Sequence, residues 1–368
     1  MAAFQSNNLK LALPQMKSVI NKALEIVEAK RESGAVDFQD LCVRMTLDVI
    51  GAVAYGANFG GLDGSRQIRE LLLKIGHMLV QRVINPVTIL TLRFFPNSKR
   101  IRDQNDTIER LGAEWRGVAE ESRNRDDPPP GVEPVWYGLK HLVDPGTGKK
   151  IDLESMRAEI GVGTLGGMDT TGHQLAWLCA IISAHPQVET KLMAELAGRG
   201  LVGAKAREVE FDDLGELSYL NATVKEGMRV ASIFTSSFPR ELERDMSILG
   251  YRLPKGTKVV LAGNRFMNSE ADWGPDPESF RPERWLTQED MSQKYYLGFS
   301  FGPRDCVGQR LAMTEMKMAL ISFFRRYQLS LTVPYEKLIE NSRNGVAVEV
   351  RDGIWFNVSL RSEHESQI

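Results

Sequence analysis

The stretch Phe299 to Gly308 reads Phe-Ser-Phe-Gly-Pro-Arg-Asp-Cys-Val-Gly and leads directly into Gln309 to Tyr327, which has the pattern of a helix. Gly302 and Gly308 let the backbone turn sharply or approach a flat partner closely. Cys306 comes just before the predicted helix, where backbone N–H groups and the positive helix end favour an ionised sulfur. Cys306 is therefore a candidate soft metal ligand, and a buried structural cysteine is the alternative.

A single cysteine suits a cofactor that brings most of its own ligands. Zinc and iron–sulfur sites need several protein ligands, but Cys42 and Cys179 lie far from Cys306 in the sequence and no Cys-x-x-Cys spacing occurs. Haem is such a cofactor, and Arg304 would offer a rigid guanidinium fork to a haem propionate. The residues thus favour haem over a metal held by protein ligands alone.

The same ten residues resemble the haem-binding signature of the cytochrome P450 family, Phe-x-x-Gly-x-Arg-x-Cys-x-Gly, at every fixed position. The resemblance implies that Cys306 is the axial thiolate ligand of the haem iron and that Arg304 binds a propionate. It also makes Phe299, Gly302 and Gly308 part of the cofactor-binding loop.

A long helix is predicted from Asp152 and Glu154 to about Ala184, just before a proline. Its centre reads Gly-Gly-Met-Asp-Thr-Thr at residues 166–171. Each glycine costs a helix interior about 1 kcal/mol relative to alanine, so a reason for two is expected. A flat ligand close to the helix, a widened turn, or a solvent-facing weak spot are the alternatives.

These six residues resemble the oxygen-activation motif of the family, Ala/Gly-Gly-x-Asp/Glu-Thr-Thr. The resemblance implies that Asp169 and Thr170 deliver protons to bound dioxygen, and that Gly166 and Gly167 border the cofactor.

A predicted helix from Leu217 to Val230 carries Glu226 and Arg229 three residues apart, a spacing that usually gives a weak surface ion pair. The pair resembles the Glu-x-x-Arg motif of the family, and Phe-Arg-Pro-Glu-Arg-Trp at 280–285 resembles the later segment whose arginine joins it. The resemblance implies that Arg284 completes a buried structural triad that supports the cysteine loop.

One further arginine resembles a family position less closely than the motifs above do. Arg240, within Phe-Pro-Arg-Glu-Leu, falls where the family often places a second propionate-binding arginine. In contrast, Val-Ala-Ser at 230–232 replaces the usual leucine- and proline-bearing continuation of Glu-x-x-Arg, so substrate contacts near it are expected to be unusual.

Composition narrows the class of protein. The 368 residues include 46 basic and 48 acidic side chains, which gives no whole-chain indication of nucleic-acid binding. Three cysteines favour a reducing, intracellular compartment over a disulfide-stapled secreted domain. No apolar run reaches the roughly 18 residues that a membrane-spanning helix needs.

The first residues show no signal or anchor segment, whereas the resemblance implies anchoring in the endoplasmic reticulum membrane for most full-length eukaryotic relatives. Ala3 to Leu9 resembles the segment that comes after the early family helix bearing a tryptophan and an arginine for the propionates. We therefore expect the N-terminal part of the family's fold, including the first sheet, to be missing.

Other elements are predicted from periodicity and turn residues. The predicted helices span Leu13 to Arg31 with Pro14 in the first turn, Phe38 to Gly51 with Asp37 as N-cap, Ser65 to Gln81, Ser98 to Arg125, and Val135 to Val143. Hairpins are predicted for Ser247 to Ala262 and Val346 to Leu360. The apolar stretch Val83 to Phe95 is either a buried connection or an entrance that faces substrate or a membrane surface.

The resemblance implies one P450-like domain over residues 1–368, mainly α with small β-sheets. It implies a haem-thiolate monooxygenase that inserts one atom of O2 into a small lipophilic substrate. No dinucleotide-binding motif is present, so electrons would come from an NADPH-dependent reductase or another donor. The alternatives are a catalytically silent fragment, or an isomerase or dehydratase that needs no donor, although such enzymes often lack a threonine equivalent to Thr170.

Overall fold

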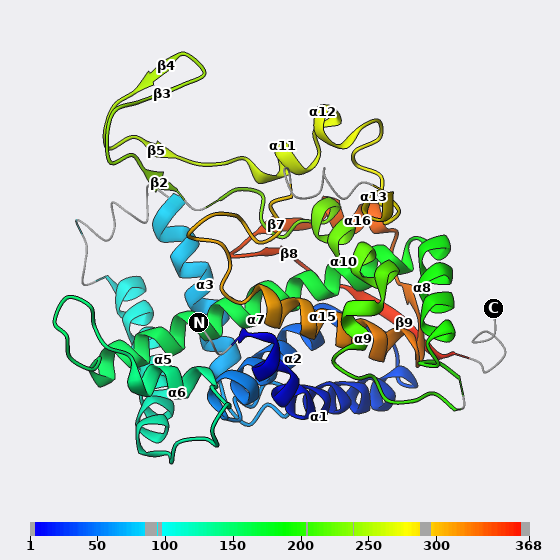
Figure 1. Cartoon of the computed structure of the whole chain (residues 1–368), viewed down its shortest axis with the longest axis horizontal. Helices are drawn as coiled ribbons and strands as arrows, with labels where there is room; N and C mark the ends of the chain where they lie inside the picture. The colour runs from blue at the N-terminus through cyan, green and yellow to red at the C-terminus, as the bar shows by residue number, and fades with distance from the viewer. Residues whose placement is uncertain are drawn as a thin grey trace.

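Helices dominate the chain, as the sequence predicts (Figure 1). The computed structural model describes residues 4–84, 94, 98–203, 205–237, 239–287 and 296–361. The longer helices are α1 (Ser6–Arg31), α2 (Phe38–Ile50), α3 (Ile68–Ile84), α5 (Lys99–Asn124), α7 (Leu153–Ser183), α8 (Pro186–Gly198), α10 (Ser218–Val230) and α15 (Gln309–Phe324). The shorter ones are η2 (Gly51–Tyr55), α6 (Val135–His141), α9 (Asp213–Glu216), α11 (Gly263–Met267), α12 (Glu270–Trp273), α13 (Arg284–Thr287) and α16 (Tyr335–Glu340).

The strands in the described part of the chain are short and form four antiparallel sheets. The largest has the order β1-β9-β6, from β1 (Val36–Asp37), β9 (Trp355–Leu360) and β6 (Tyr327–Leu331). The pairs are β2 (Arg240–Glu241) with β5 (Lys258–Val259), β3 (Met246–Ile248) with β4 (Tyr251–Leu253), and β7 (Ser342–Asn344) with β8 (Val348–Val350). In Figure 1 the β3–β4 hairpin stands away from the helical body.

Helix α7 runs through the middle of the molecule, with α15 beside it (Figure 1). It begins where the sequence predicts, because the side chain of Asp152 accepts a hydrogen bond of 2.7 Å from the Ser155 N–H. Residues 171–182 are all buried, so the second half of the helix is core on every side. The first half is buried on one side only, and this difference leaves part of α7 open to a ligand.

Glycines let α2 lie close against α7. A Cβ on Gly172 would lie 2.6 Å from the Cα atom of Val43, and one on Gly167 would lie 2.9 Å from Cγ1 of Ile50. The Thr46 hydroxyl donates to the Met168 carbonyl across the same contact at 2.8 Å. Helix packing therefore supplies a reason of its own for Gly167.

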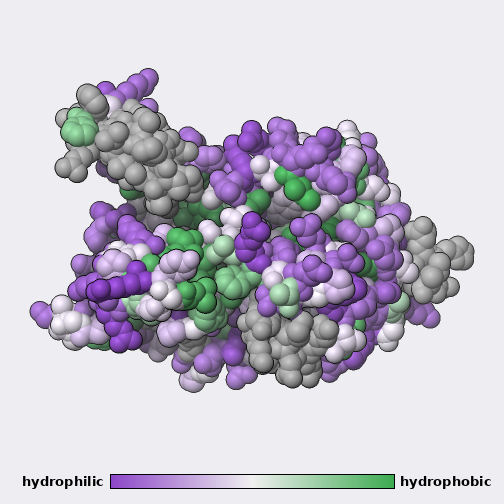
Figure 2. Space-filling model, turned by 90° about the horizontal axis from the view of Figure 1, so that it is seen from above, coloured by the Kyte–Doolittle hydropathy of each residue, from purple (hydrophilic) through white to green (hydrophobic). Residues whose placement is uncertain are grey.

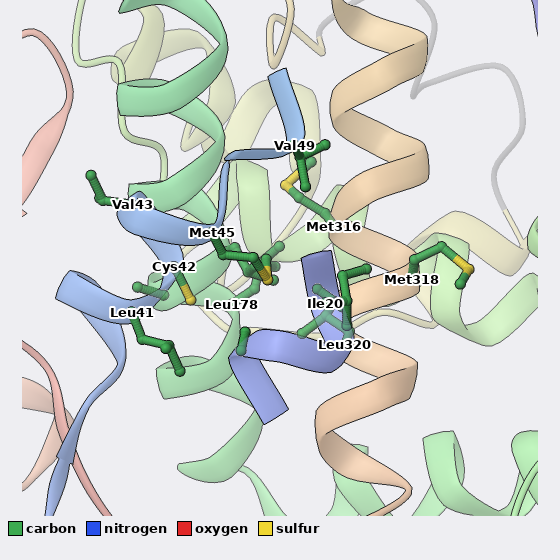
Figure 3. Packing of buried hydrophobic residues seen from close by; sticks show 14 of the residues in the cluster. Ile20, Leu41, Cys42, Val43, Met45, Val49, Leu178, Met316, Met318 and Leu320 are labelled. Carbon is green, nitrogen blue, oxygen red and sulfur yellow. The ribbon is translucent and has the colours of Figure 1, made fainter. Parts of the chain in front are cut away.

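Four helices contribute to the centre of the core (Figure 3). Ile20 of α1, Met45 of α2, Leu178 of α7 and Leu320 of α15 meet there and are fully or almost fully buried. Cys42 lies in the same cluster, and burial raises the pKa of its thiol well above the ordinary value. Cys42 thus packs as a small apolar side chain, as expected for a cysteine that is not a ligand.

Two sequence expectations about α1 and the C-terminal strands are wrong. Helix α1 begins at Ser6 and contains Pro14 in its interior, because Leu9 extends the buried stripe one turn further back. Val346 to Leu360 is not one hairpin: β8 pairs with β7, whereas β9 pairs with β6 and β1. Phe356 of β9 is fully buried, so packing against the core decides the partner of this strand.

Smaller differences concern turns. The chain does not leave the helix at Gly51 but continues as the π-helical η2, which Gly56 ends with a φ of +61°. The Ser247 to Ala262 stretch forms a hairpin only as far as Leu253, with its turn at Leu249 and Gly250. Its last strand, β5, pairs with β2 and takes no part in this hairpin.

The apolar stretch 83–95 lies almost entirely outside the described residues. Among the described helices, none combines the length and apolar character that a bilayer crossing requires.

Two glycines of α7 are expected to differ in how much their replacement by alanine changes the stability of the protein. We expect Gly172→Ala to destabilise the protein by about 1–3 kcal/mol, since the new methyl group would collide with the Val43 backbone. Gly166→Ala meets no atom within 4 Å, so we expect it to be neutral or to stabilise the helix by up to about 1 kcal/mol. Urea unfolding of the two variants measures the difference. A Gly172→Ala variant that is as stable as Gly166→Ala would show that the α2–α7 contact is looser than described.

Candidate functional site

The cysteine loop ends where α15 begins. The Cys306 N–H donates to the Phe299 carbonyl at 3.0 Å, and the Asp305 N–H donates to the Gly302 carbonyl at 3.1 Å. Gly302 adopts a φ of +82°, a conformation that side chains disfavour. The loop is thus closed on itself by its own backbone, and Cys306 lies exposed at its end.

Two opposing effects act on the Cys306 sulfur. Desolvation by burial is the largest cause and raises the pKa of the thiol, as does the negative charge of Asp305, while the backbone N–H groups of Gly308 and Gln309 lower it. The N–H groups at the helix start thus lower the pKa of the thiol as expected, but without a bound metal desolvation has the larger effect. Metal coordination deprotonates a thiol outright, so the two N–H groups would then stabilise the bound sulfur.

The open side of α7 carries three residues spaced four apart. Val162 is 73% exposed, Gly166 is exposed, and Thr170 is partly buried. The Thr170 hydroxyl donates to the Gly166 carbonyl at 2.6 Å, which holds the side chain against the helix. The helix is regular over residues 166–171, so the widened-turn alternative does not apply.

Asp169 points away from this open side. Its Oδ2 atom accepts a hydrogen bond of 3.1 Å from the Ala347 N–H in the β7–β8 turn, and its Oδ1 atom lies 3.5 Å from Nδ1 of His173. Burial raises the pKa of the Asp169 carboxyl, and His173 acts in the opposite direction. The structure therefore connects Asp169 to a β-turn and shows no hydrogen bond between it and Thr170.

The three predicted triad residues come together in a buried site. Arg229 donates to both carboxylate oxygens of Glu226, at 2.8 Å and 2.7 Å, in a bidentate pair. The Nε atom of Arg284 lies 3.3 Å from Oε1 of Glu226 without hydrogen-bond geometry. Glu226 and Arg229 have no exposed surface, and Arg284 is only 5% exposed. The pair is thus not the weak surface contact that the spacing alone indicates.

The backbone and two tryptophans complete this network. The indole Nε1–H of Trp285 donates to Glu226 at 2.8 Å, and Arg284 donates to the Trp273 carbonyl at 2.7 Å. The ring of Trp285 also packs edge-on against Tyr296, just before the cysteine loop, with ring centroids 5.0 Å apart. The network therefore reaches the start of the loop, through a tryptophan that lies within the predicted motif but to which the sequence assigns no role.

The two candidate propionate ligands lie on separate elements. Arg304 is in the cysteine loop, and Arg240 is in β2, where it pairs with Val259 of β5. Both arginines are exposed, and neither is paired with a carboxylate in the described part of the chain. Both guanidinium groups are thus available for an anionic group.

The exposed residues of the loop would fit a flat, apolar group that is held by a thiolate. Phe301 and Val307 flank the site with 65% and 58% of their surface exposed, which is unusual for large apolar side chains. In Figure 2 hydrophobic residues gather toward the middle of the face seen from above, while hydrophilic residues dominate its edge. Within the described residues, no group of three or more His, Cys, Asp or Glu side chains offers a site for a metal held by protein alone.

Among the described residues, the three cavities considered next lie elsewhere on the surface. The largest, of about 680 Å³, lies between α3 and α5 and is lined by residues that include His77 and Met78. The other two, of about 560 and 450 Å³, lie along α5. None of these three cavities is lined by Cys306 or Thr170, so they are separate from the candidate site.

A mainly helical fold, with an exposed cysteine in a closed loop and a buried Glu-Arg-Arg network behind it, is typical of haem-thiolate proteins. The sequence model of the family "Cytochrome P450" matches residues 1–352, and the chain belongs to that family. The resemblance found in the sequence is thus confirmed at the level of the family.

Individual relatives are moderately similar. "Cytochrome P450 4V2" of Rattus norvegicus is 27% identical over 337 residues, which cover 87% of this chain and 62% of the relative. "Putative cytochrome P450 CYP13A7" of Caenorhabditis elegans is 31% identical over 364 residues, covering 89% of this chain and 68% of the relative. The chain therefore spans less than two thirds of the rat protein's length.

Solved structures confirm the fold. The "cytochrome P450DA heme domain" matches 99% of this chain and 75% of its own, with a TM-score of 0.80 and 22% identity. A mutant of the same heme domain matches with a TM-score of 0.83 and 23% identity. At these identities the likeness shows the arrangement of helices and sheets.

Proposed function

We propose that this chain is one P450-type domain, residues 1–368, that binds haem through Cys306 and acts as a monooxygenase. The observation that carries the proposal is the exposed Cys306 sulfur, faced by the N–H groups of Gly308 and Gln309 in a loop closed onto Phe299. Arg304 and Arg240 are the candidate partners of the propionates.

The remaining loop and helix residues would shape the pocket. Gly302 gives the loop its turn, and Phe299 closes it through its carbonyl. Gly166 leaves space on the open side of α7, and Gly167 lets the helix lie against α2. When bound, haem would supply the activation of O2 and the transfer of one oxygen atom to a small lipophilic substrate, with electrons from a reductase or another donor protein.

Two residues of α7, Asp169 and Thr170, would deliver protons to the site. Because burial raises the pKa of Asp169, this carboxyl takes up a proton at a higher pH than a free aspartic acid does. It is therefore suited to accept protons from the protein side, and a turn of its side chain toward Thr170 would release them to the open side of the helix. The Thr170 hydroxyl lies on the open side and would turn away from the Gly166 carbonyl to hold and pass on a proton at its Oγ1 atom.

The proposal is tested by adding haem, NADPH and a reductase to the purified chain. A monooxygenase consumes NADPH and O2 together and forms an oxidised product. An isomerase or dehydratase forms product without consuming either, and a silent fragment does neither. Either of the last two results would contradict the proposed function.

Thr170→Ala separates proton delivery from substrate binding. We expect the variant to bind substrate and carbon monoxide normally, while most of the NADPH consumed yields peroxide in place of product. Thr190→Ala is a matched control, because the Thr190 hydroxyl makes the same bond to the carbonyl four residues earlier, at 2.9 Å, on the exposed side of α8. Unchanged coupling of NADPH use to product in Thr170→Ala would contradict the assigned role.

A further inference from the structure

His173 lies between two acidic side chains inside the protein. It is 3% exposed and sits one turn after Asp169 on α7. Its Nδ1 atom lies 2.7 Å from the Asp169 carbonyl oxygen and 3.5 Å from Asp169 Oδ1. Its Nε2 atom lies 3.7 Å from Oε2 of Glu349. Since a carbonyl oxygen only accepts, Nδ1 carries the ring proton, and Nε2 faces the second carboxylate.

Glu349 connects this cluster to the surface. It lies in β8, and its Oε1 atom accepts a hydrogen bond of 2.7 Å from Nε of Arg343 in β7. The side chain of Glu349 is 15% exposed and that of Arg343 is 43% exposed. His77 on α3 is a further titratable group that acts on Asp169, and its side chain is exposed. Polar groups thus lead from solvent through Glu349 and His173 to Asp169.

We propose that His173 is a positioning residue that passes protons from Glu349 to Asp169, an inference that rests on the proposed function of Asp169. A protonated Glu349 would give its proton to Nε2 while the Nδ1 proton moves to Oδ1 of Asp169. Only protons move, and Glu349 is protonated again from water. The ring is left with its proton on Nε2. Loss of that proton to the Glu349 carboxylate, together with uptake of a proton from water at Nδ1, restores the starting tautomer.

The position of the second nitrogen distinguishes His173 from a histidine that only packs. His185, two residues beyond the end of α7, makes the same bond from Nδ1 to the carbonyl four residues earlier, at 2.7 Å. Its ring meets Phe280 edge-on, with centroids 5.1 Å apart, and no carboxylate in the described ranges pairs with it. His185 is therefore a matched control with the local hydrogen bond and without the acidic partners.

The first test needs neither haem nor turnover. The carboxyl stretch of Asp169, assigned by its loss in Asp169→Asn, is followed by infrared difference spectroscopy against pH in the haem-free chain. We expect His173→Gln to raise the pKa of Asp169 and Glu349→Gln to lower it, because His173 lowers that pKa and Glu349 raises it. His185→Gln leaves it unchanged. No shift in either cluster variant would overturn the proposal.

The second test uses the haem-loaded protein with reductase and NADPH. We expect His173→Gln and Glu349→Gln to slow product formation roughly tenfold or more and to increase the solvent deuterium isotope effect, as loss of a proton-transfer step does. His185→Gln should match the wild type. Normal wild-type turnover with unaffected cluster variants would overturn the relay alone, whereas a wild type that forms no product would overturn the proposed function first. Glu349→Gln, near the surface, keeps the test valid if His173→Gln folds poorly.

Discussion

Replacing Glu226 by alanine is expected to leave little folded, haem-loaded protein. Glu226 has no exposed surface and accepts hydrogen bonds from Arg229, Trp285 and the Arg281 N–H. Without it, the buried guanidinium of Arg229 loses its carboxylate, and Arg284 loses its nearby counter-charge. Breaking a buried ion pair in this way costs about 3–5 kcal/mol, a large part of the roughly 5–15 kcal/mol that stabilises a domain.

The control for this prediction is Glu216→Ala. Glu216 also forms an ion pair with an arginine, Arg199, but the two side chains are 58% and 44% exposed. Such exposed pairs contribute no more than about 1 kcal/mol, so this variant should express and unfold like the wild type. Soluble yield, haem content and urea unfolding of both variants are the measurements. Normal yield of Glu226→Ala with a selective loss of turnover would show that Glu226 has a chemical role instead.

Cys306→Ala is expected to have the opposite pattern, with an intact fold and no thiolate-bound haem. Because the Cys306 side chain is exposed, its removal should change the unfolding free energy of the haem-free chain by no more than about 0.5 kcal/mol. Turnover should fall to background, since the variant lacks the sulfur that would hold the haem. Cys42→Ala is the control, because Cys42 packs in the core and should leave haem binding intact.

The sequence predicts well those features that depend on neighbouring residues. Helix α7 begins at the Asp152 cap and α2 begins at Asp37, whose carboxylate accepts from the Gln39 N–H at 2.9 Å. The motifs also predicted that Glu226, Arg229 and Arg284 meet in the fold, although the spacing of Glu226 and Arg229 alone indicates only a surface ion pair. Local signals were sufficient at these places because the interacting atoms are close in sequence or the motif is long.

Features that depend on distant residues were not predictable. The Ala347 N–H that binds Asp169 comes from a turn 178 residues later, and Glu349 reaches His173 from the same hairpin. Nothing in either segment identifies its partner. The need for a glycine at position 167 likewise comes from its contact with Ile50, more than 100 residues earlier. Packing against the core decides that β9 pairs with β6. Long-range contacts thus define the surroundings of the motif residues, while the motifs themselves are visible in the sequence.

The central claim is that Cys306 ligates haem iron as a thiolate, and the absorption spectrum of the ferrous, carbon monoxide-bound protein tests it most directly. The wild type and Cys42→Ala should both show the strongly red-shifted Soret band of thiolate-ligated haem. Cys306→Ala should lack that band at equal protein concentration. A red-shifted band that persists in Cys306→Ala, or a wild type that binds haem without ever showing it, would contradict the assignment.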